Sequence, residues 1–425
     1  MTALPAHDAR LPTHDPFAEI HPPLTTDAAL AESHRCLYCY DAPCTRACPT
    51  HIDVPAFIKK IASGNLTGSA RTILDANPMG HSCARACPVE VMCEGACVMN
   101  DRDEKPINIA LLQRHATDYA LAKDLHLFAP GPATGRKVAI IGAGPAGLSC
   151  AQDLRRRGHA VTIFESRREP GGLNTCGIAE YKLRAPTALA EARMVLELGA
   201  TLKTGVSVGR DVMLDALLKD FDAVFVAIGL GATKSLGIPG EQLEGVVDAL
   251  TFIEVLKLRR AQVKVGRHVV VIGAGNTAID AVTQAKRLGA ESSTIVYRRG
   301  EEDMPCYDYE YELGKADGCA FRFHCTPLEV LGRQSTVDGQ PQAVSRQPST
   351  VTGLRVRTPA GEEVIPCDMV IKALGQVPRT DFTIPADHPK LFIGGDCANG
   401  GAEIVNAAAE GKEAARKINA MLGGN

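Results

Sequence analysis

Lys137-Val-Ala-Ile-Ile-Gly-Ala-Gly-Pro-Ala-Gly-Leu148 is the stretch of sequence that decides the fold. Its apolar first half predicts a buried β-strand, and Gly142, Gly144 and Gly147 then form a G-x-G-x-x-G pattern. In that pattern the glycines permit a tight turn and let a pyrophosphate approach a helix N-terminus. The next predicted strand ends in Glu165, at the distance expected for an acid that binds the adenosine ribose. Together the strand, the turn and the acid predict a dinucleotide-binding domain.

A second glycine turn lies in His268-Val-Val-Val-Ile-Gly-Ala-Gly-Asn-Thr-Ala278 and predicts a second domain of the same kind. The strand after this turn ends in Arg298 and Arg299, where the first domain has its acid. Arginines at this position can bind a 2′-phosphate, which favours NADPH over NADH. The alternative is that they cap the strand or bind pyrophosphate, which would leave the coenzyme open.

The stretch Leu391-Phe-Ile-Gly-Gly-Asp396 near the C-terminus indicates which turn binds a flavin. A strand that ends in Gly-Gly-Asp can hold a ribityl chain, and a helix starting near Ala402 would point its positive end at the flavin ring. The first turn and this tail therefore predict an FAD domain, interrupted by an NAD(P) domain. The candidate FAD residues are Gly142, Gly144, Pro145, Ala146, Gly147, Glu165, Gly172, Leu173, Gly395, Asp396, Glu403 and Ile404. The candidate NAD(P) residues are Gly273, Gly275, Asn276, Thr277, Arg298 and Arg299.

Upstream, eight cysteines are spaced C-x2-C-x4-C-x3-C-P over 36–49 and C-x3-C-P-x4-C-x3-C over 83–97. Soft thiolates at such short spacings suit iron–sulfur clusters. In bacterial ferredoxins a cysteine before proline, last in its run, binds the other cluster, so Cys36, Cys39 and Cys44 form one triad and Cys48 crosses over. We therefore expect two [4Fe–4S] clusters. Zinc ribbons are the alternative, but they prefer paired C-x2-C knuckles, and only the first pair has that spacing.

These motifs predict an α/β protein in which a small all-α iron–sulfur domain precedes two nested Rossmann-like domains for FAD and NAD(P). Helices are expected over 54–64, 67–76 and 107–122, and the polar stretch Gln334–Thr352 predicts a long hairpin loop. The expected boundaries are an extended arm over 1–30, the helical domain over 31–128, the FAD domain over 136–235 and 371–425, and the NAD(P) domain over 236–370.

The composition narrows the class of protein. A net charge of -3 gives no footprint for nucleic acid or a membrane surface, and no apolar run approaches the roughly 20 residues of a spanning helix. The N-terminus lacks the apolar core of a signal peptide. We expect a cytoplasmic protein, in which clustered thiols are metal ligands rather than disulfides.

The cysteine-rich helical domain is followed by the FAD turn, the NAD(P) turn and the Gly-Gly-Asp tail. In this order of parts the chain resembles the glutamate synthase small-subunit superfamily. Within that superfamily it is similar to the N-terminal half of dihydropyrimidine dehydrogenases, which bacteria carry as a separate subunit. The similar stretches are Arg35-Cys-Leu-Tyr-Cys-Tyr-Asp-Ala-Pro-Cys44, Cys48-Pro-Thr-His-Ile-Asp53, Asn77-Pro-Met-Gly80 and Pro106-Ile-Asn-Ile-Ala-Leu-Leu-Gln113. The resemblance implies a first cluster bound by Cys36, Cys39, Cys44 and Cys97. It implies a second cluster bound by Cys48, Cys87, Cys93 and Gln113, with Cys83 left as a free thiol.

The resemblance also implies a function. The chain would oxidise NAD(P)H through FAD and pass electrons through both clusters to an FMN-containing catalytic subunit, which reduces uracil or thymine. No side chain of this chain is expected to act as a catalytic acid or base. The subunits that the chain resembles are NAD-linked, whereas Arg298 and Arg299 favour NADPH. Either NADH or NADPH is therefore expected as the coenzyme.

Other functions compete with this one. The small subunit of glutamate synthase, or of a ferredoxin-linked transhydrogenase, would take electrons in the same way and deliver them elsewhere. A disulfide reductase needs a cysteine pair beside the flavin, and Gly171-Gly-Leu-Asn-Thr-Cys176 offers one cysteine. A scaffold with degenerate sites is disfavoured because both glycine turns are intact.

Overall fold

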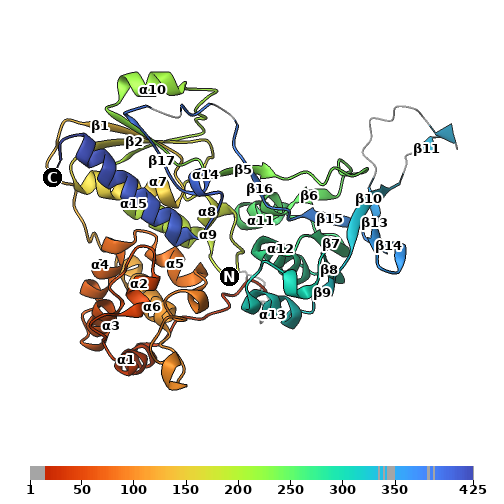
Figure 1. The fold of residues 1–425 in the computed structure, drawn as a ribbon, viewed down its shortest axis with the longest axis horizontal. Coiled ribbons are helices and arrows are strands. Elements are labelled where there is room, and N and C mark those ends of the chain that lie inside the picture. Colours follow the sequence, from red (N-terminus) through yellow and green to blue (C-terminus); the bar gives the residue numbers. More distant parts are fainter. Residues whose placement is uncertain are drawn as a thin grey trace, which may run out of the picture.

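The computed structural model consists of three parts, which Figure 1 shows side by side. A helical domain lies below a first α/β domain, and a second α/β domain lies to the right of both (Figure 1). The residues that the structure describes are 15–333, 336–337, 340–341, 350–380, 383–385 and 388–424.

The helical domain is built from short amphipathic helices. In one of them, α3, the side chain of Asp53 accepts a hydrogen bond from the N–H of Ala56, and Val54, Phe57, Ile58 and Ile61 are buried at helical spacing. The helices are α1 (Thr26–Arg35), α2 (Pro43–Ala47), α3 (Val54–Ala62), α4 (Leu66–Ala76), α5 (Gly80–Ala86) and α6 (Ile109–Ala122), with 3₁₀ turns η1 (Val89–Val91) and η2 (Asn100–Arg102).

The arm expected over residues 1–30 ends earlier than the prolines suggested. Helix α1 begins at Thr26, because Thr25 caps it by accepting a hydrogen bond from the N–H of Ala28. Residues 15–21 run as an arm, but not freely in solvent, since Phe17 is buried against Tyr181 and Leu256 of the α/β domains.

The first α/β domain is a parallel sheet of strand order β17-β4-β1-β2-β3. Helix α15 packs along α7, where a Cβ on Gly411 would lie 2.1 Å from the carbonyl oxygen of Ala146. The strands are β1 (Lys137–Ile141), β2 (Ala160–Glu165), β3 (Thr201–Thr204), β4 (Ala223–Val226) and β17 (Leu391–Ile393). The helices are α7 (Pro145–Arg156), α8 (Leu173–Cys176), α9 (Ala185–Leu196), α10 (Leu214–Asp220), α14 (Asp396–Asn399) and α15 (Ile404–Met421).

The second α/β domain repeats this plan with strand order β6-β15-β7-β8-β9, also parallel. An antiparallel sheet of order β10-β13-β14 extends from it. The strands are β6 (Val246–Asp248), β7 (His268–Ile272), β8 (Ser292–Val296), β9 (Ala320–Arg322), β10 (Thr326–Gly332), β13 (Val351–Thr358), β14 (Gly361–Pro366) and β15 (Met369–Lys372). The helices are α11 (Ala249–Leu258), α12 (Asn276–Arg287) and α13 (Asp308–Ala316), with 3₁₀ turns η3 (Arg260–Gln262) and η4 (Glu301–Asp303).

The second domain is inserted between β4 and β17 of the first, as the sequence predicted. The two connections, β5 (Leu230–Thr233) and β16 (Gln376–Pro378), pair with each other in antiparallel fashion. The expected boundary at 370/371 cuts through β15, which pairs with β6 and β7 and so belongs to the second sheet.

The hairpin expected over Gln334–Thr352 lies largely outside the described residues. The parts described there, β11 (Thr336–Val337) and β12 (Gln340–Pro341), form an antiparallel pair. No helix in the described part of the chain is long and apolar enough to cross a bilayer.

Candidate functional site

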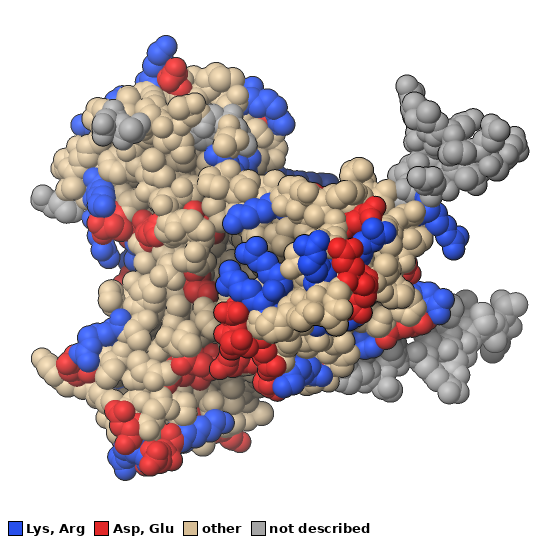
Figure 2. Space-filling model, turned by 45° about the vertical axis from the view of Figure 1, so that its right-hand side comes forward, with Lys and Arg blue, Asp and Glu red and all other residues tan. Residues whose placement is uncertain are grey.

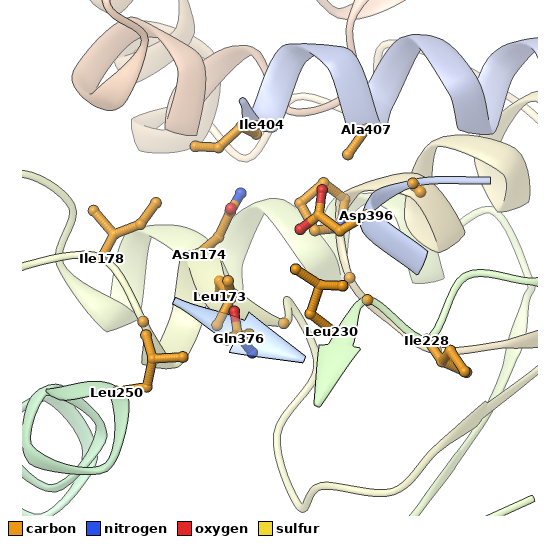
Figure 3. A pocket seen from close by; sticks show the side chains of 18 of the residues that line it. Leu173, Asn174, Ile178, Ile228, Leu230, Leu250, Gln376, Asp396, Ile404 and Ala407 are labelled. Atoms are coloured by element: carbon orange, nitrogen blue, oxygen red, sulfur yellow. The ribbon is translucent and has the colours of Figure 1, made fainter. Parts of the chain in front are cut away.

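A cavity of about 710 Å³ opens between the two α/β domains and is lined by residues of both. This volume lies in the range typical of cofactor sites. Figure 3 shows its walls, with Ile404 and Ala407 of α15 on one side and Leu173 and Leu230 on the other. The cavity therefore lies where the two predicted dinucleotide sites meet.

The three glycines of the first turn have different surroundings. A Cβ on Gly142 would lie 2.3 Å from the carbonyl oxygen of Ala227, and a Cβ on Gly147 would lie 2.0 Å from that of Gly142. By contrast, a Cβ on Gly144 would meet nothing closer than the Cα of Gly172, at 3.9 Å. The first and third glycines thus permit packing within the turn, while Gly144 keeps the cavity open for a ligand to approach the N-terminus of α7.

Glu165, at the end of β2, is buried and lines the same cavity. Its carboxylate accepts hydrogen bonds from the N–H of Ala143 and the N–H of Arg167, both at 2.8 Å. These bonds hold the carboxylate beside the glycine turn, where an acid can bind ribose hydroxyls.

The C-terminal tail supplies the opposite wall. Gly395 adopts a φ of +75° after β17, and Asp396 follows at the cavity. Burial raises the pKa of Asp396, whose carboxylate accepts a hydrogen bond from the N–H of Ala402 at 3.3 Å. Helix α15 begins directly after Glu403, and Ile404 in its first turn lines the cavity, so the positive end of its dipole faces the site.

The second turn follows the same design. Gly273 has a φ of +129°, and a Cβ there would lie 2.2 Å from the carbonyl oxygen of Ala373, whereas a Cβ on Gly275 would meet nothing closer than 3.9 Å. Asn276 and Thr277, at the N-terminus of α12, line the cavity. The turn is therefore open to a second dinucleotide.

Arg298 and Arg299 lie just past the end of β8 and are exposed. Neither lines the cavity, and neither side chain has a hydrogen-bond or ion-pair partner within the described ranges. They remain free to bind a phosphate outside the cavity.

The candidate residues divide into two groups by position. Those that line the cavity are Gly142, Gly144, Pro145, Ala146, Glu165, Gly172, Leu173, Gly395, Asp396, Glu403, Ile404, Asn276 and Thr277. Those that do not line it are Gly147, Gly273, Gly275, Arg298 and Arg299.

In the helical domain, Cys36, Cys39, Cys44 and Cys97 surround one small void. Its other walls come from residues such as Val54 and Ile58 of α3 and from the segment before α6. Burial raises the pKa of Cys44 to about 11, and the nearby Cys36, Cys97 and Cys39 add to this effect.

A second group of cysteines gathers around Cys87. A hydrogen bond with Cys83, burial, and the nearby Cys93 and Cys48 all raise the pKa of Cys87. Gln113 on α6 is buried, and its Nε2 donates to the carbonyl oxygen of Gly80 at 2.8 Å. Its Oε1 accepts no hydrogen bond from the described residues, so the amide oxygen is available to a ligand.

Among the described residues, no group of three or more His, Cys, Asp or Glu side chains is arranged around a single metal ion. The soft thiolates that line the void are the donor set that an iron–sulfur cluster takes.

Two family models match the chain. Residues 13–125 match "Dihydroprymidine dehydrogenase domain II, 4Fe-4S cluster" and residues 136–411 match "Pyridine nucleotide-disulphide oxidoreductase". The small chain of glutamate synthase [NADPH] of Escherichia coli K12 is 33% identical over 446 residues, covering 95% of this chain and 93% of the relative. The PreT subunit of the NAD-dependent dihydropyrimidine dehydrogenase of Salmonella typhimurium is also 33% identical, over 97% of this chain and 98% of the relative.

The chain belongs to the family of glutamate synthase small chains and PreT subunits.

As a member of this family, the chain is an NAD(P)-dependent FAD oxidoreductase with a 4Fe–4S domain, and it acts as an electron-transfer subunit.

The predicted fold is confirmed by solved structures. FprA from Mycobacterium tuberculosis (a His57Gln mutant) has a TM-score of 0.55 at 19% identity, over 69% of this chain and 85% of that one. Thioredoxin reductase of T. acidophilum has a TM-score of 0.52 at 22% identity, over 67% of this chain and 98% of that one. At these identities the likeness concerns the fold alone.

The sequence analysis missed a buried network of charged side chains beside the cavity between the two α/β domains. Lys182 lies 2.6 Å from Asp280 of α12 and also pairs with Glu310 of α13, and the hydroxyl of Tyr181 donates to Asp280 at 3.0 Å. The partners come from different domains and are far apart in the sequence, so no local pattern could have found them.

Cys176, the single cysteine beside the flavin turn, does not have the environment of a redox thiol. It is buried, its Sγ donates to the carbonyl oxygen of Gly172 at 3.1 Å, and burial raises its pKa to about 11. A thiol held protonated is a poor nucleophile, which argues against disulfide reduction.

Proposed function

We propose that this chain is the electron-input subunit of a dihydropyrimidine dehydrogenase. In this proposal it oxidises NAD(P)H through FAD and delivers electrons through two [4Fe–4S] clusters to an FMN-containing partner, which reduces uracil or thymine to the 5,6-dihydro form. The observation that carries the proposal is the position of the cysteine groups relative to the flavin cavity.

The second cysteine group adjoins that cavity. Ala86 lines the cavity, and Cys87 follows it directly in the chain. Tyr307 also lines the cavity, and its hydroxyl donates to Glu403 at 2.8 Å. Burial and Glu403 raise the pKa of Tyr307, and the nearby Cys87 adds to this effect. A cluster at Cys87 would therefore lie next to the flavin.

The first cysteine group faces outward. Leu37 lines the void between Cys36, Cys39, Cys44 and Cys97, and it is 50% exposed. Tyr40 in the same loop is fully exposed. One group is thus adjacent to the cavity and the other to the surface, as a route from flavin to an external acceptor requires.

We propose Cys36, Cys39, Cys44 and Cys97 as the ligands of the first cluster. For the second we propose Cys48, Cys87, Cys93 and Gln113. When bound, FAD supplies hydride acceptance and the clusters supply single-electron transfer. The chain's own part is to bind and orient them. Glu165 would bind the adenosine ribose, Gly144 would admit the pyrophosphate, and the N-terminus of α15 would favour negative charge at the ring.

The proposal requires a partner for the pyrimidine chemistry. Within the described residues both large sheets are open parallel sheets. In this proposal each of them gives its glycine turn to a dinucleotide, which leaves no sheet for an FMN and a pyrimidine. Residues 13–125 match a domain that is named after dihydropyrimidine dehydrogenase, which supports an FMN-containing pyrimidine-reducing partner as the electron acceptor. The second candidate is the small chain of glutamate synthase, which the equal identity to that relative supports.

The test is to express the chain alone and with a candidate FMN subunit, and to follow NAD(P)H oxidation with uracil as the acceptor. We expect the lone chain to reduce artificial acceptors but not uracil, and the pair to reduce uracil. Uracil reduction by the lone chain would contradict the proposal. Glutamate formation with a glutamate synthase large chain would favour the second candidate.

A further inference from the structure

Asn174, on the short helix α8, has an unusual side-chain environment. It lines the flavin cavity and is 2% exposed, yet neither Nδ2 nor Oδ1 has a hydrogen-bond partner in the described structure. Figure 3 shows its amide pointing from α8 into the cavity, toward Ile404. Burying an unpaired amide is unfavourable, so such a group calls for a partner that binds in the cavity.

The backbone at Asn174 is held from the other domain. Lys257 on α11 donates from Nζ to the carbonyl oxygens of Asn174 at 3.1 Å, Ile178 at 2.8 Å and Leu183 at 2.6 Å. Burial lowers the pKa of Lys257 to about 8, and the three carbonyls satisfy its three donors. This contact ties α8 and the loop after it to the NAD(P) domain.

The immediate surroundings of the amide are apolar. Leu173, Ile178 and Ile404 line the cavity around it. A flat ring with apolar faces and a polar edge fits these walls, because the amide offers that edge one donor group and one acceptor. The isoalloxazine ring of a flavin has this character, with carbonyl and N–H groups along one edge.

We propose that Asn174 is a flavin-contacting residue whose amide hydrogen-bonds the polar edge of the bound FAD ring, and that Lys257 is the residue that positions it. The docking of the NAD(P) domain then helps to set the flavin's environment. This inference rests on FAD binding at the first turn and does not depend on which partner accepts the electrons.

Asn174→Leu tests the contact, because leucine has nearly the same shape and no polar atoms. In the FAD-free protein this change removes an unpaired buried amide, so the melting temperature should rise. In FAD titrations of the same protein the Kd should rise by about three- to tenfold, the loss of one or two net hydrogen bonds. An amide with only a structural role would instead lower the melting temperature and leave the Kd unchanged, which would overturn the proposal.

Thr175→Val is the matched control in the next position. Thr175 is buried, does not line the cavity, and donates from Oγ1 to the carbonyl oxygen of Pro170 at 2.7 Å. Its loss should lower the melting temperature with little effect on the Kd for FAD. If Asn174→Leu weakened NAD(P)H binding and left FAD binding intact, the amide would face the nicotinamide and the proposal would be wrong.

Lys257→Met tests the positioning role in a double-mutant cycle. If Lys257 acts through Asn174, the change should weaken FAD binding, and the double variant should lose less than the product of the two single effects. Lys257→Arg, which keeps donors near the carbonyls, should restore part of the affinity. Iron content serves as the check of folding. Independent, multiplicative losses in a folded double variant would contradict the positioning role.

Discussion

Gly144 and Gly147 lie one helical turn apart, and substitution should separate a binding role from a packing role. Gly144→Ala has room in the chain itself, because a Cβ meets nothing closer than 3.9 Å, but it would obstruct a pyrophosphate. We expect a folded protein with normal iron content and FAD affinity reduced by about tenfold or more, or about 1.4 kcal/mol. Gly147→Ala would press against a carbonyl oxygen at 2.0 Å and should lower the melting temperature. Normal FAD affinity in Gly144→Ala would contradict this division of roles.

Gln113 and Cys83 are the two rivals for the last ligand of the second cluster. Because Gln113 has a free amide oxygen and Cys83 accepts a hydrogen bond from Asn77 Nδ2 at 3.2 Å, we expect the glutamine to be the ligand. Gln113→Ala should alter one reduced-cluster signal in electron paramagnetic resonance and leave the other intact. Cys83→Ala should do far less than Cys87→Ala. The assignment fails if Cys83 is essential and Gln113 is dispensable.

Arg298 tests the coenzyme. If it binds a 2′-phosphate, Arg298→Ala should weaken NADPH binding by about 1.5 to 3 kcal/mol and NADH binding much less. Arg267→Ala is the control, since Arg267 is exposed and pairs with Glu291 just before β7, at the opposite end of that strand from the turn. Equal losses for both coenzymes would mean that Arg298 does not read the 2′-phosphate.

The sequence identified residues of the site where function requires a local pattern. The glycine turns and Glu165 depend on spacing within one strand–turn–helix unit, and the structure places Glu165 beside the first turn. That Glu165 binds the ribose stays a prediction. Asn174 and Lys257 could not be found in this way, because the role of each depends on a neighbour about 80 residues away or more in another domain.

At the scale of elements, helix α5 is joined to α9 of the FAD domain by a buried carboxylate. Glu191 accepts hydrogen bonds from the N–H groups of His81 and Ser82, and burial raises its pKa to about 7. Because the folded state then binds the proton more tightly than the unfolded chain, stability should fall by about 2 kcal/mol between about pH 5.5 and pH 7.5. Burial also lowers the pKa of His81, which lies near Arg85 and Asp118, to about 3. The stability that the neutral His81 contributes is therefore lost as the pH falls below about 6.5.

Comparing Glu191→Gln with the unmodified chain isolates the effect of Glu191 on the pH dependence of stability, because His81 contributes equally in both proteins. The variant should lose less stability across that pH range in denaturant unfolding. Glu312→Gln, an exposed carboxylate on α13, should leave the pH dependence unchanged. Identical slopes for Glu191→Gln and the unmodified chain would contradict the raised pKa.

Element boundaries differed from expectation where neighbours outside the local sequence decide them. Residues of β15 belong to the second sheet because β6 and β7 flank them, a pairing that spans about 100 residues or more. Helix α1 starts within the expected arm because Thr25 caps it. This cap is a local signal, but in the sequence analysis the preceding prolines were given more weight. By contrast, helix α4 (Leu66–Ala76) was predicted to within one residue, since its periodicity is strong.

At the scale of the whole molecule, the arm of residues 15–21 contacts all three domains. Phe17 packs with Tyr181 of the FAD domain and Leu256 of the NAD(P) domain, and Glu19 pairs with Arg85 and Arg114 of the helical domain. Figure 2 turns the NAD(P) domain forward and shows basic side chains around a hollow, with acidic side chains directly below them. The arm therefore links the three domains through one apolar contact and two ion pairs.

The central claim is that the chain carries electrons from one flavin into two clusters, and the metal and flavin content of the intact protein tests it most directly. The measurement is iron, zinc and FAD per chain in protein purified without oxygen. The predicted result is one FAD and about eight irons, with no stoichiometric zinc. Zinc in place of iron, or about four irons, would contradict the claim.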